Sequence, residues 1–198
     1  MIRKATDQDI PYLSSIHMAA LPDDLLPRLG TAFLTRCFYP AGIDSKNAFI
    51  LVNVNAENCI CAFSVFAYDS ELFLQAVKRR KFFLFFSMFK TVLASLSFLK
   101  EIAIYLRKFR MVLKETDIDL SRFPELYLIA TNPEYQGLGL GGELLTEGLA
   151  RLRTEGCLVK TSSTDAKRFY IRHGFREIGK EYRGSRCLSV LLIEFFAV

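Results

Sequence analysis

The stretch LYLIATNPEYQGLGLGGELL, residues 126–145, constrains the fold more than any other part of the chain. Its apolar start predicts a strand, a short polar loop follows, and glycines then begin a helix. Glycines let backbone N–H groups turn toward a ligand without a Cβ in the way, and a helix N-terminus adds partial positive charge. The stretch therefore predicts a phosphate-binding turn between a strand and a helix.

Two familiar phosphate-binding turns do not match this stretch. A Walker A loop needs Gly-Lys followed by Ser or Thr, and this pair is missing here. Gly137, Gly139 and Gly142 satisfy G-x-G-x-x-G, but in the Rossmann fold that motif follows its strand almost directly, and an acid ends the next strand. Here NPEYQ intervenes, and Asp165 is placed to begin a helix instead. A dinucleotide site is therefore disfavoured.

The rest of the chain alternates between strand and helix patterns within one domain, residues 1–198. Its 198 residues are 51% apolar, enough for one packed core. Short runs of alternating or helical periodicity predict the elements in the following order: strand 1–6, helices to about 20 and over 25–38, hairpin strands within 48–68, a helical insertion at 71–113, strand 122–131, helix to about 156, strand 157–163, helix 165–175 and two closing strands.

Charge and cysteine content exclude several classes of function. The net charge of +5 suits a polyphosphate ligand, an acidic substrate or an anionic membrane, and selects none of them. There is no basic stripe with interleaved exposed aromatics, so no nucleic-acid partner is expected. Five scattered cysteines without a CxxC pair, and two histidines, predict no metal site and indicate reduced thiols in the cytoplasm. The first ten residues are charged, unlike a secretory signal.

A second motif fits the glycine-rich turn better. Gln136, Gly139 and Gly141 fill Q/R-x-x-G-x-G/A, and an A-x-x-x-Y…GF segment follows about thirty residues later. That segment consists of Ala166, Tyr170, Gly174 and Phe175. Over residues 124–176 the sequence resembles the GNAT family of acetyl-CoA-dependent N-acetyltransferases. The resemblance implies an α/β (α+β) fold, a mixed, mostly antiparallel twisted sheet flanked by helices, with a helical insertion before the motif strand.

The resemblance also implies acetyl-CoA as co-substrate, no metal, and a set of residues that bind the coenzyme. The pantetheine arm would lie along the backbone of Ile129, Ala130 and Thr131. Many members bind this arm through an Asn at the position of Ser163. Either the hydroxyl of Ser162 or Ser163 replaces that contact here, or the contact is lost. The pyrophosphate would be held by Gln136, Gly137, Leu138, Gly139, Leu140, Gly141 and Gly142.

For catalysis, the resemblance implies Tyr170 as the acid that protonates the departing thiolate. Glu125, eleven residues before Gln136, is the candidate base, with Glu134 and Asp165 as weaker candidates. Direct transfer to a primary amine in a ternary complex is expected, with a small molecule or an amino-sugar as acceptor. A protein N-acetyltransferase and a non-catalytic acyl-CoA-binding module are the alternatives. His17 is either part of the acceptor site or structural, and Cys157 is expected to be buried.

The insertion contains KRRKFFLFFSMFK, which looks like a membrane segment. Residues 82–99 reach the minimum length for a span, but polar residues gather on one side of the helical pattern. A span would also separate strands that must pair in one sheet. Three interpretations remain: a lid or specificity helix over the acceptor, a homodimer interface, or peripheral membrane contact through residues 78–106 with Lys78 to Lys81 near anionic headgroups.

Overall fold

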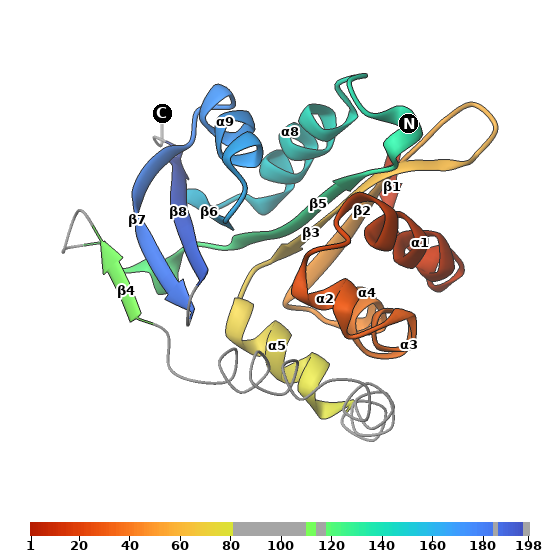
Figure 1. The fold of residues 1–198 in the computed structure, drawn as a ribbon, viewed down its shortest axis with the longest axis horizontal. Helices are drawn as coiled ribbons and strands as arrows, with labels where there is room; N and C mark the ends of the chain where they lie inside the picture. Colours follow the sequence, from red (N-terminus) through yellow and green to blue (C-terminus); the bar gives the residue numbers. More distant parts are fainter. Residues whose placement is uncertain (81–109, 114–117, 184–185, 196–198) are drawn as a thin grey trace.

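The computed structural model describes residues 1–80, 110–113, 118–183 and 186–195. Within these residues, eight strands form one sheet in the order β1-β2-β3-β5-β6-β8-β7-β4 (Figure 1). Neighbouring strands are antiparallel except β5 and β6, which are parallel. The α/β fold class, with a mixed and mostly antiparallel sheet flanked by helices, is therefore confirmed.

The strands and helices have the following bounds. The strands are β1 (Ile2–Lys4), β2 (Ala48–Val54), β3 (Ile60–Ala67), β4 (Arg110–Leu113), β5 (Glu125–Thr131), β6 (Gly156–Thr161), β7 (Arg176–Arg183) and β8 (Arg186–Glu194). The α-helices are α1 (Ile10–Ala20), α2 (Leu25–Arg28), α3 (Thr31–Phe33), α4 (Tyr39–Asp44), α5 (Ser70–Arg79), α8 (Leu140–Leu152) and α9 (Thr164–Arg172). The short turns are the 3₁₀ helices η1 (Asp7–Asp9), η3 (Leu120–Arg122) and η4 (Pro133–Tyr135) and the π-helical turn η2 (Leu34–Phe38).

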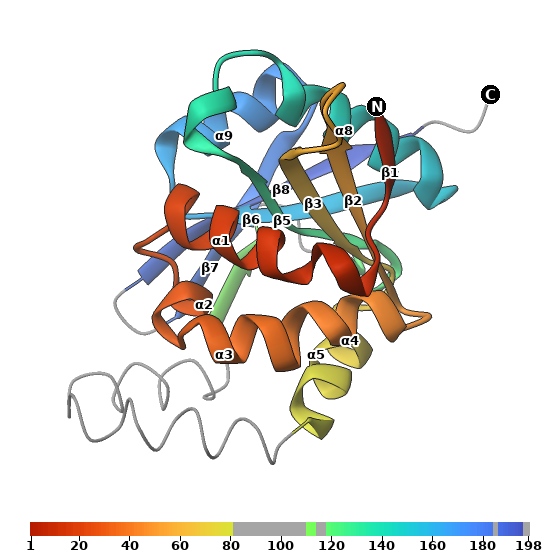
Figure 2. The same cartoon turned by 90° about the vertical axis from the view of Figure 1, so that its right-hand side faces the viewer.

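The central strands are buried on both faces, so successive side chains enter two different cores. In β2, Ile50 and Val52 pack into the core beneath α1 and α4, whereas Phe49 and Leu51 pack into the core beneath α8 and α9. This division follows from the period of two in a strand. Figures 1 and 2 show the two groups of helices on opposite sides of the sheet.

Two predicted helical segments differ from the structure. The continuous helix expected over 25–38 is broken, because Gly30 adopts a φ of 90° and separates α2 from α3. The predicted insertion begins as expected with α5, but residues 110–113 form strand β4, paired with β7. The pairing of β4 extends the sheet at its edge. Residues 81–109, on which the lid, dimer and membrane interpretations depend, lie outside the described residues.

The sheet opens between β5 and β6. These parallel strands pair only at Glu125 with Leu158 and at Leu126 with Val159. Beyond this point β5 continues along β3 to Thr131, while β6 continues along β8. The register between β3 and β5 skips Tyr127, which marks a β-bulge, and bulges bend the strand that carries them. The bend in β5 begins where the two strands separate, which leaves an open space between them.

None of the helices in the described ranges is long and apolar enough to cross a membrane.

Candidate active site

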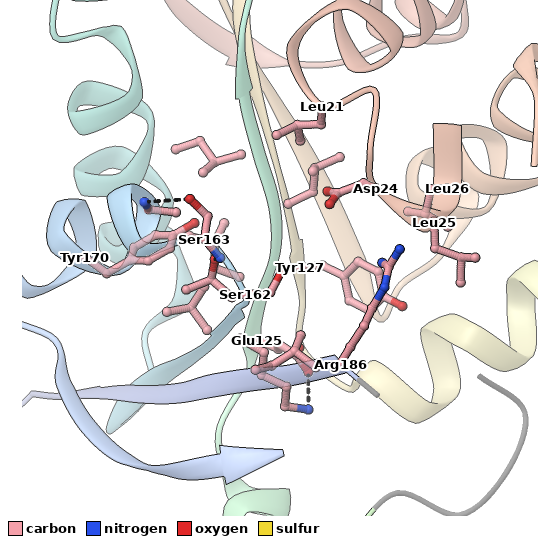
Figure 3. A pocket seen from close by; sticks show the side chains of 18 residues that line it. Leu21, Asp24, Leu25, Leu26, Glu125, Tyr127, Ser162, Ser163, Tyr170 and Arg186 are labelled. Atoms are coloured by element: carbon pink, nitrogen blue, oxygen red, sulfur yellow. Dashed lines mark hydrogen bonds and ion pairs between the residues drawn. The ribbon is translucent and has the colours of Figure 1, made fainter. Parts of the chain in front are cut away.

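A cavity of about 320 Å³ lies where β5 and β6 separate. Its walls come from both strands, from α9, from α2 and the connection before it, and from the beginning of β8. Leucines from the α1–α2 side make one wall apolar, and Ser162 and Ser163 make the opposite wall polar (Figure 3). The cavity therefore combines a polar channel along the split with an apolar chamber.

Tyr170 lies on α9 and faces this cavity. Its side chain packs against Phe169 and Phe175, which fix the ring, and only 5% of the residue is exposed. Burial raises the pKa of the Tyr170 phenol well above its usual value, and the charges of Cys157 and Asp24 act in the same direction. Tyr170 therefore keeps its proton at neutral pH and can donate a hydrogen bond to an atom in the cavity.

Glu125, the candidate base, lies on the wall of the same cavity at the start of β5. Its carboxylate accepts a hydrogen bond from the Ser70 hydroxyl at 2.8 Å and forms an ion pair with Lys160 at 3.3 Å. Lys160 also lies 3.3 Å from the buried Glu181. The structure brings Glu125 and Tyr170 to one cavity, but the carboxylate of Glu125 is already engaged, so its role as base stays a prediction.

The glycine-rich turn adopts the shape that a phosphate site needs. Gly137 and Gly139 have φ values of 80° and 81°, and a Cβ at either position would meet nothing within 4 Å. Gly139 is the N-cap of α8, so the first N–H groups of this helix have no partner within it. Beside Gly141 lie the side chains of Thr131 and Ile129, so the helix begins at the end of β5.

The remaining residues that are predicted to bind the coenzyme lie between the cavity and the glycine-rich turn. Ile129 lines the cavity, and Ala130 pairs with Phe63 of β3. Gln136 donates a side-chain hydrogen bond to the carbonyl of Thr131 at 3.3 Å. The Ser163 hydroxyl lines the cavity but accepts a hydrogen bond from the N–H of Ala166, as the N-cap of α9.

His17 and Cys157 lie outside the cavity, and both are fully buried. His17 forms a hydrogen bond of 2.8 Å with the Tyr39 hydroxyl, so it is a core residue and not part of an acceptor site. Burial raises the pKa of the Cys157 thiol to about 12. A thiol this basic carries too little thiolate to act as a nucleophile at neutral pH.

Two further residues of the cavity were not found by sequence reasoning: Asp24, in the α1–α2 connection, and Arg186, at the start of β8. Figure 3 shows Asp24 directed into the cavity from the wall opposite Tyr170. Their local sequences, LPDD and GSRC, look like ordinary turns, and both residues are exposed, so nothing in the sequence marks them as residues of a cavity. No group of His, Cys, Asp or Glu within the described ranges is arranged to hold a metal ion.

A sheet split between two parallel strands, with a cavity in the split and a glycine-rich helix N-terminus at its end, agrees with the arrangement that the resemblance to acetyl-CoA-dependent transferases implies. Residues 108–177 match the family model of the acetyltransferase (GNAT) domain. This match covers about a third of the chain and places that segment among GNAT acetyltransferase domains. No curated protein matches the sequence significantly.

Solved structures show the same fold over nearly the whole chain. A structure described as histone acetyltransferase HPA2 and related acetyltransferase, from Corynebacterium glutamicum, has 17% identity and a TM-score of 0.64, covering 100% of this chain and 97% of its own. An N-acetyltransferase from Staphylococcus aureus has 18% identity and a TM-score of 0.61, with coverages of 98% and 100%. The ribosomal-protein-S18-alanine N-acetyltransferase from Escherichia coli has 13% identity and a TM-score of 0.60, with coverages of 100% and 95%.

Proposed function

We propose that this protein transfers the acetyl group of acetyl-CoA directly to the primary amine of a small molecule bound in the cavity. The observation that carries this proposal is the cavity itself, which lies in the split between β5 and β6 and contains Tyr170. The pyrophosphate would lie at the glycine turn that begins α8, and the pantetheine arm along Ile129 to Thr131. The acetyl thioester would then reach the chamber near Tyr170.

In this arrangement the neutral acceptor amine attacks the acetyl carbonyl carbon, and the C–S bond breaks after a tetrahedral intermediate forms. The nitrogen loses one proton in this step, and a proton is gained by the CoA sulfur, so the products are the amide and the CoA thiol. A backbone N–H near Ala130 stabilises the negatively charged oxygen of that intermediate. Tyr170 donates its phenolic hydrogen bond to the departing CoA sulfur. Because the pKa of Tyr170 is raised, it is a weak acid, so stabilising the thiolate by this hydrogen bond is its main contribution.

A protein acceptor is the alternative, since the Escherichia coli neighbour is named for an alanine of a ribosomal protein. Support for a small molecule comes from the volume of the cavity, about 320 Å³, and from its apolar wall, which consists of Leu21 after α1 and of Leu25 and Leu26 in α2. The test is a turnover assay in which CoA thiol release is followed with acetyl-CoA and a panel of small amines and peptides. Binding of CoA without thiol release for any acceptor would instead favour a non-catalytic acyl-CoA-binding module.

Replacing Tyr170 tests the catalytic part of the proposal. Tyr170→Phe is expected to lower kcat by roughly 100-fold, because it removes the hydrogen bond to the leaving sulfur, while the Kd for CoA changes little. Tyr12→Phe, at an exposed position on α1, is the matched control and should leave kcat unchanged. An unchanged kcat for Tyr170→Phe from pH 6 to pH 9 would exclude this role.

A further inference from the structure

Among the described residues, two acidic and two basic side chains line the cavity, and one acid and one base of these four form an ion pair with each other. Glu125 and Lys160 form an ion pair, and Lys160 is also held by Glu181. In the described part of the chain, neither Asp24 nor Arg186 lies within 4 Å of an oppositely charged side chain. The two are close enough for the charge of Arg186 to act on Asp24. Asp24 and Arg186 are therefore two opposite charges that line one cavity without forming an ion pair with each other.

Asp24 occupies a position at which its carboxylate would normally cap a helix. It is the N-cap of α2, yet its side chain accepts no capping hydrogen bond and is directed into the cavity instead (Figure 3). Desolvation raises the pKa of this carboxyl, against the opposing effect of Arg186. The charge of Asp24 also acts on Tyr170 across the cavity. An amino group bound at Asp24 would therefore lie across the cavity from Tyr170, and it would attack the thioester after losing its extra proton.

Arg186 supplies the opposite charge at the beginning of β8. Figure 3 shows its side chain extending past Tyr127 toward the side of the cavity that holds Asp24 and Leu25. A guanidinium binds a carboxylate through two parallel hydrogen bonds, which fixes both the position and the orientation of the ligand. Apolar contacts beside these charges come from the leucine side chains of the lining: Leu21, Leu25, Leu26 and Leu188.

We propose that the acceptor is an α-amino acid with an apolar side chain, whose amino group is bound by Asp24 and whose carboxylate is bound by Arg186. This inference rests on the proposed acetyl transfer. Lys160 is paired with Glu125 and Glu181. Among the described residues of the lining, this leaves Asp24 and Arg186 as one negative and one positive charge without such a pair. This arrangement suits a zwitterion better than a diamine or a dianion. A phosphate would need further cations, and Lys160 already contacts two carboxylates.

The test compares leucine with two analogues that keep its side chain and primary amine but lack the carboxylate. In leucinamide the carboxylate is replaced by a neutral amide and the amine is less basic. In 3-methylbutylamine the carboxylate is absent and the amine is more basic. A preference for leucine over both cannot therefore come from amine basicity. Wild-type protein is expected to use leucine with a kcat/KM at least about tenfold above that for either analogue.

Variants of Arg186 and Asp24 test whether these two residues cause the preference for leucine. Arg186→Gln should bring leucine and 3-methylbutylamine to within about twofold, and Arg186→Glu should reverse the order. Asp24→Asn should raise the KM for all three amines, whereas Asp23→Asn, at the neighbouring acid that does not line the cavity, should not. Arg122→Gln, at an exposed arginine paired with Glu155, is the control for loss of a positive charge.

Calorimetry separates this inference from the proposed function. Binding of CoA and binding of leucine to the CoA-loaded protein are measured without turnover. Failure to bind CoA would contradict the proposed function. CoA binding together with equal use of leucine and both analogues, or a leucine preference that survives in Arg186→Gln, would overturn the amino-acid assignment. So would CoA-loaded protein that does not bind leucine.

Discussion

Burial shifts the pKa values of Tyr170 and His17 in opposite directions, because it disfavours the charged form of each side chain. The charged form of a tyrosine is the deprotonated one, so the pKa of Tyr170 rises. The charged form of a histidine is the protonated one, so burial lowers the pKa of His17 to about 4. Burial thus favours the neutral form of both residues, which is the protonated form of Tyr170 and the deprotonated form of His17.

His17 should make the stability of the protein depend on pH. Its folded pKa of about 4 lies below the unfolded value of 6.5, so the unfolded chain binds the proton more tightly. The stabilisation is complete above pH 6.5 and is lost as the pH falls toward 4. Between pH 7 and pH 5 we expect the free energy of unfolding to fall by roughly 2 kcal/mol from this residue. Urea unfolding at several pH values measures it.

His173 provides the control for this prediction, since the chain has two histidines. His173 lies on the C-terminal side of α9, where its Nδ1 is 2.8 Å from the carbonyl oxygen of Phe169. His17→Gln should flatten the dependence of the unfolding free energy between pH 5 and pH 7. His173→Gln should keep the dependence of the wild type. Equal slopes in wild type and His17→Gln would refute the assignment to His17.

Residues of the candidate site were predictable only where their neighbours in sequence form a motif. Tyr170 and Glu125 follow from the resemblance to the GNAT family, which their positions relative to the glycine-rich turn carry, and both line the cavity. Asp24 and Arg186 come from turns more than 100 residues away from each other in sequence. Asp24 and Arg186 come close together because the α1–α2 connection folds over the separated strands, and no local sequence pattern predicts this.

At the scale of elements, hydrophobic periodicity predicted whether a segment is a helix or a strand better than it predicted whether that element continues without a break. The alternating runs at β2 and β3 gave the central hairpin, and the glycine-rich turn gave the beginning of α8. The helix expected over 25–38 failed because a backbone with φ near +90° at Gly30 interrupts a pattern that otherwise looks continuous. Strand β4 was missed because its four residues, RMVL, fit a helix as well as a strand, and only pairing with β7 decides.

The contact between α8 and β3 should be intolerant of added volume. A Cβ at Gly148 would clash with the ring of Phe66, which is fully buried and stacked on Phe49. Gly148→Ala gains about 1 kcal/mol of helix propensity, but overpacking costs about 1–3 kcal/mol, and a contact this short belongs at the upper end. We therefore expect a net loss of about 1–2 kcal/mol in chemical denaturation.

Two further variants show whether this loss comes from the ring of Phe66. A Cβ at Gly141, in the same helix, would meet its neighbours at 3.8 Å, so Gly141→Ala should not lower the unfolding free energy. Phe66→Leu combined with Gly148→Ala should be less destabilised than the sum of the two single variants. Additive effects would show that the ring is not the obstacle.

At the scale of the whole molecule, one part of the sheet is held by the hydrophobic cores, and another part borders the cavity and is open to a ligand. The two cores hold β2, β3 and the paired part of β5 together without a ligand. The distal part of β5, beyond Leu126, has β3 on one side and the cavity on the other. A ligand inserted there would replace the missing contact with β6 and couple the two halves of the sheet.

Binding of acetyl-CoA should therefore stabilise the whole fold and protect the split. At a ligand concentration 100 times the Kd, the free energy of unfolding should rise by about 2.7 kcal/mol, seen as an increase in Tm. Hydrogen exchange should slow in residues 127–131 of β5 and around 160–163, while β2 stays unchanged. Gly139→Ala should weaken both effects, because a Cβ at a φ of 81° strains the turn that would hold the pyrophosphate. Stabilisation by CoA without protection at 127–131 would mean that the coenzyme binds outside the split, since a ligand lying along β5 cannot leave the exchange of its amides unchanged.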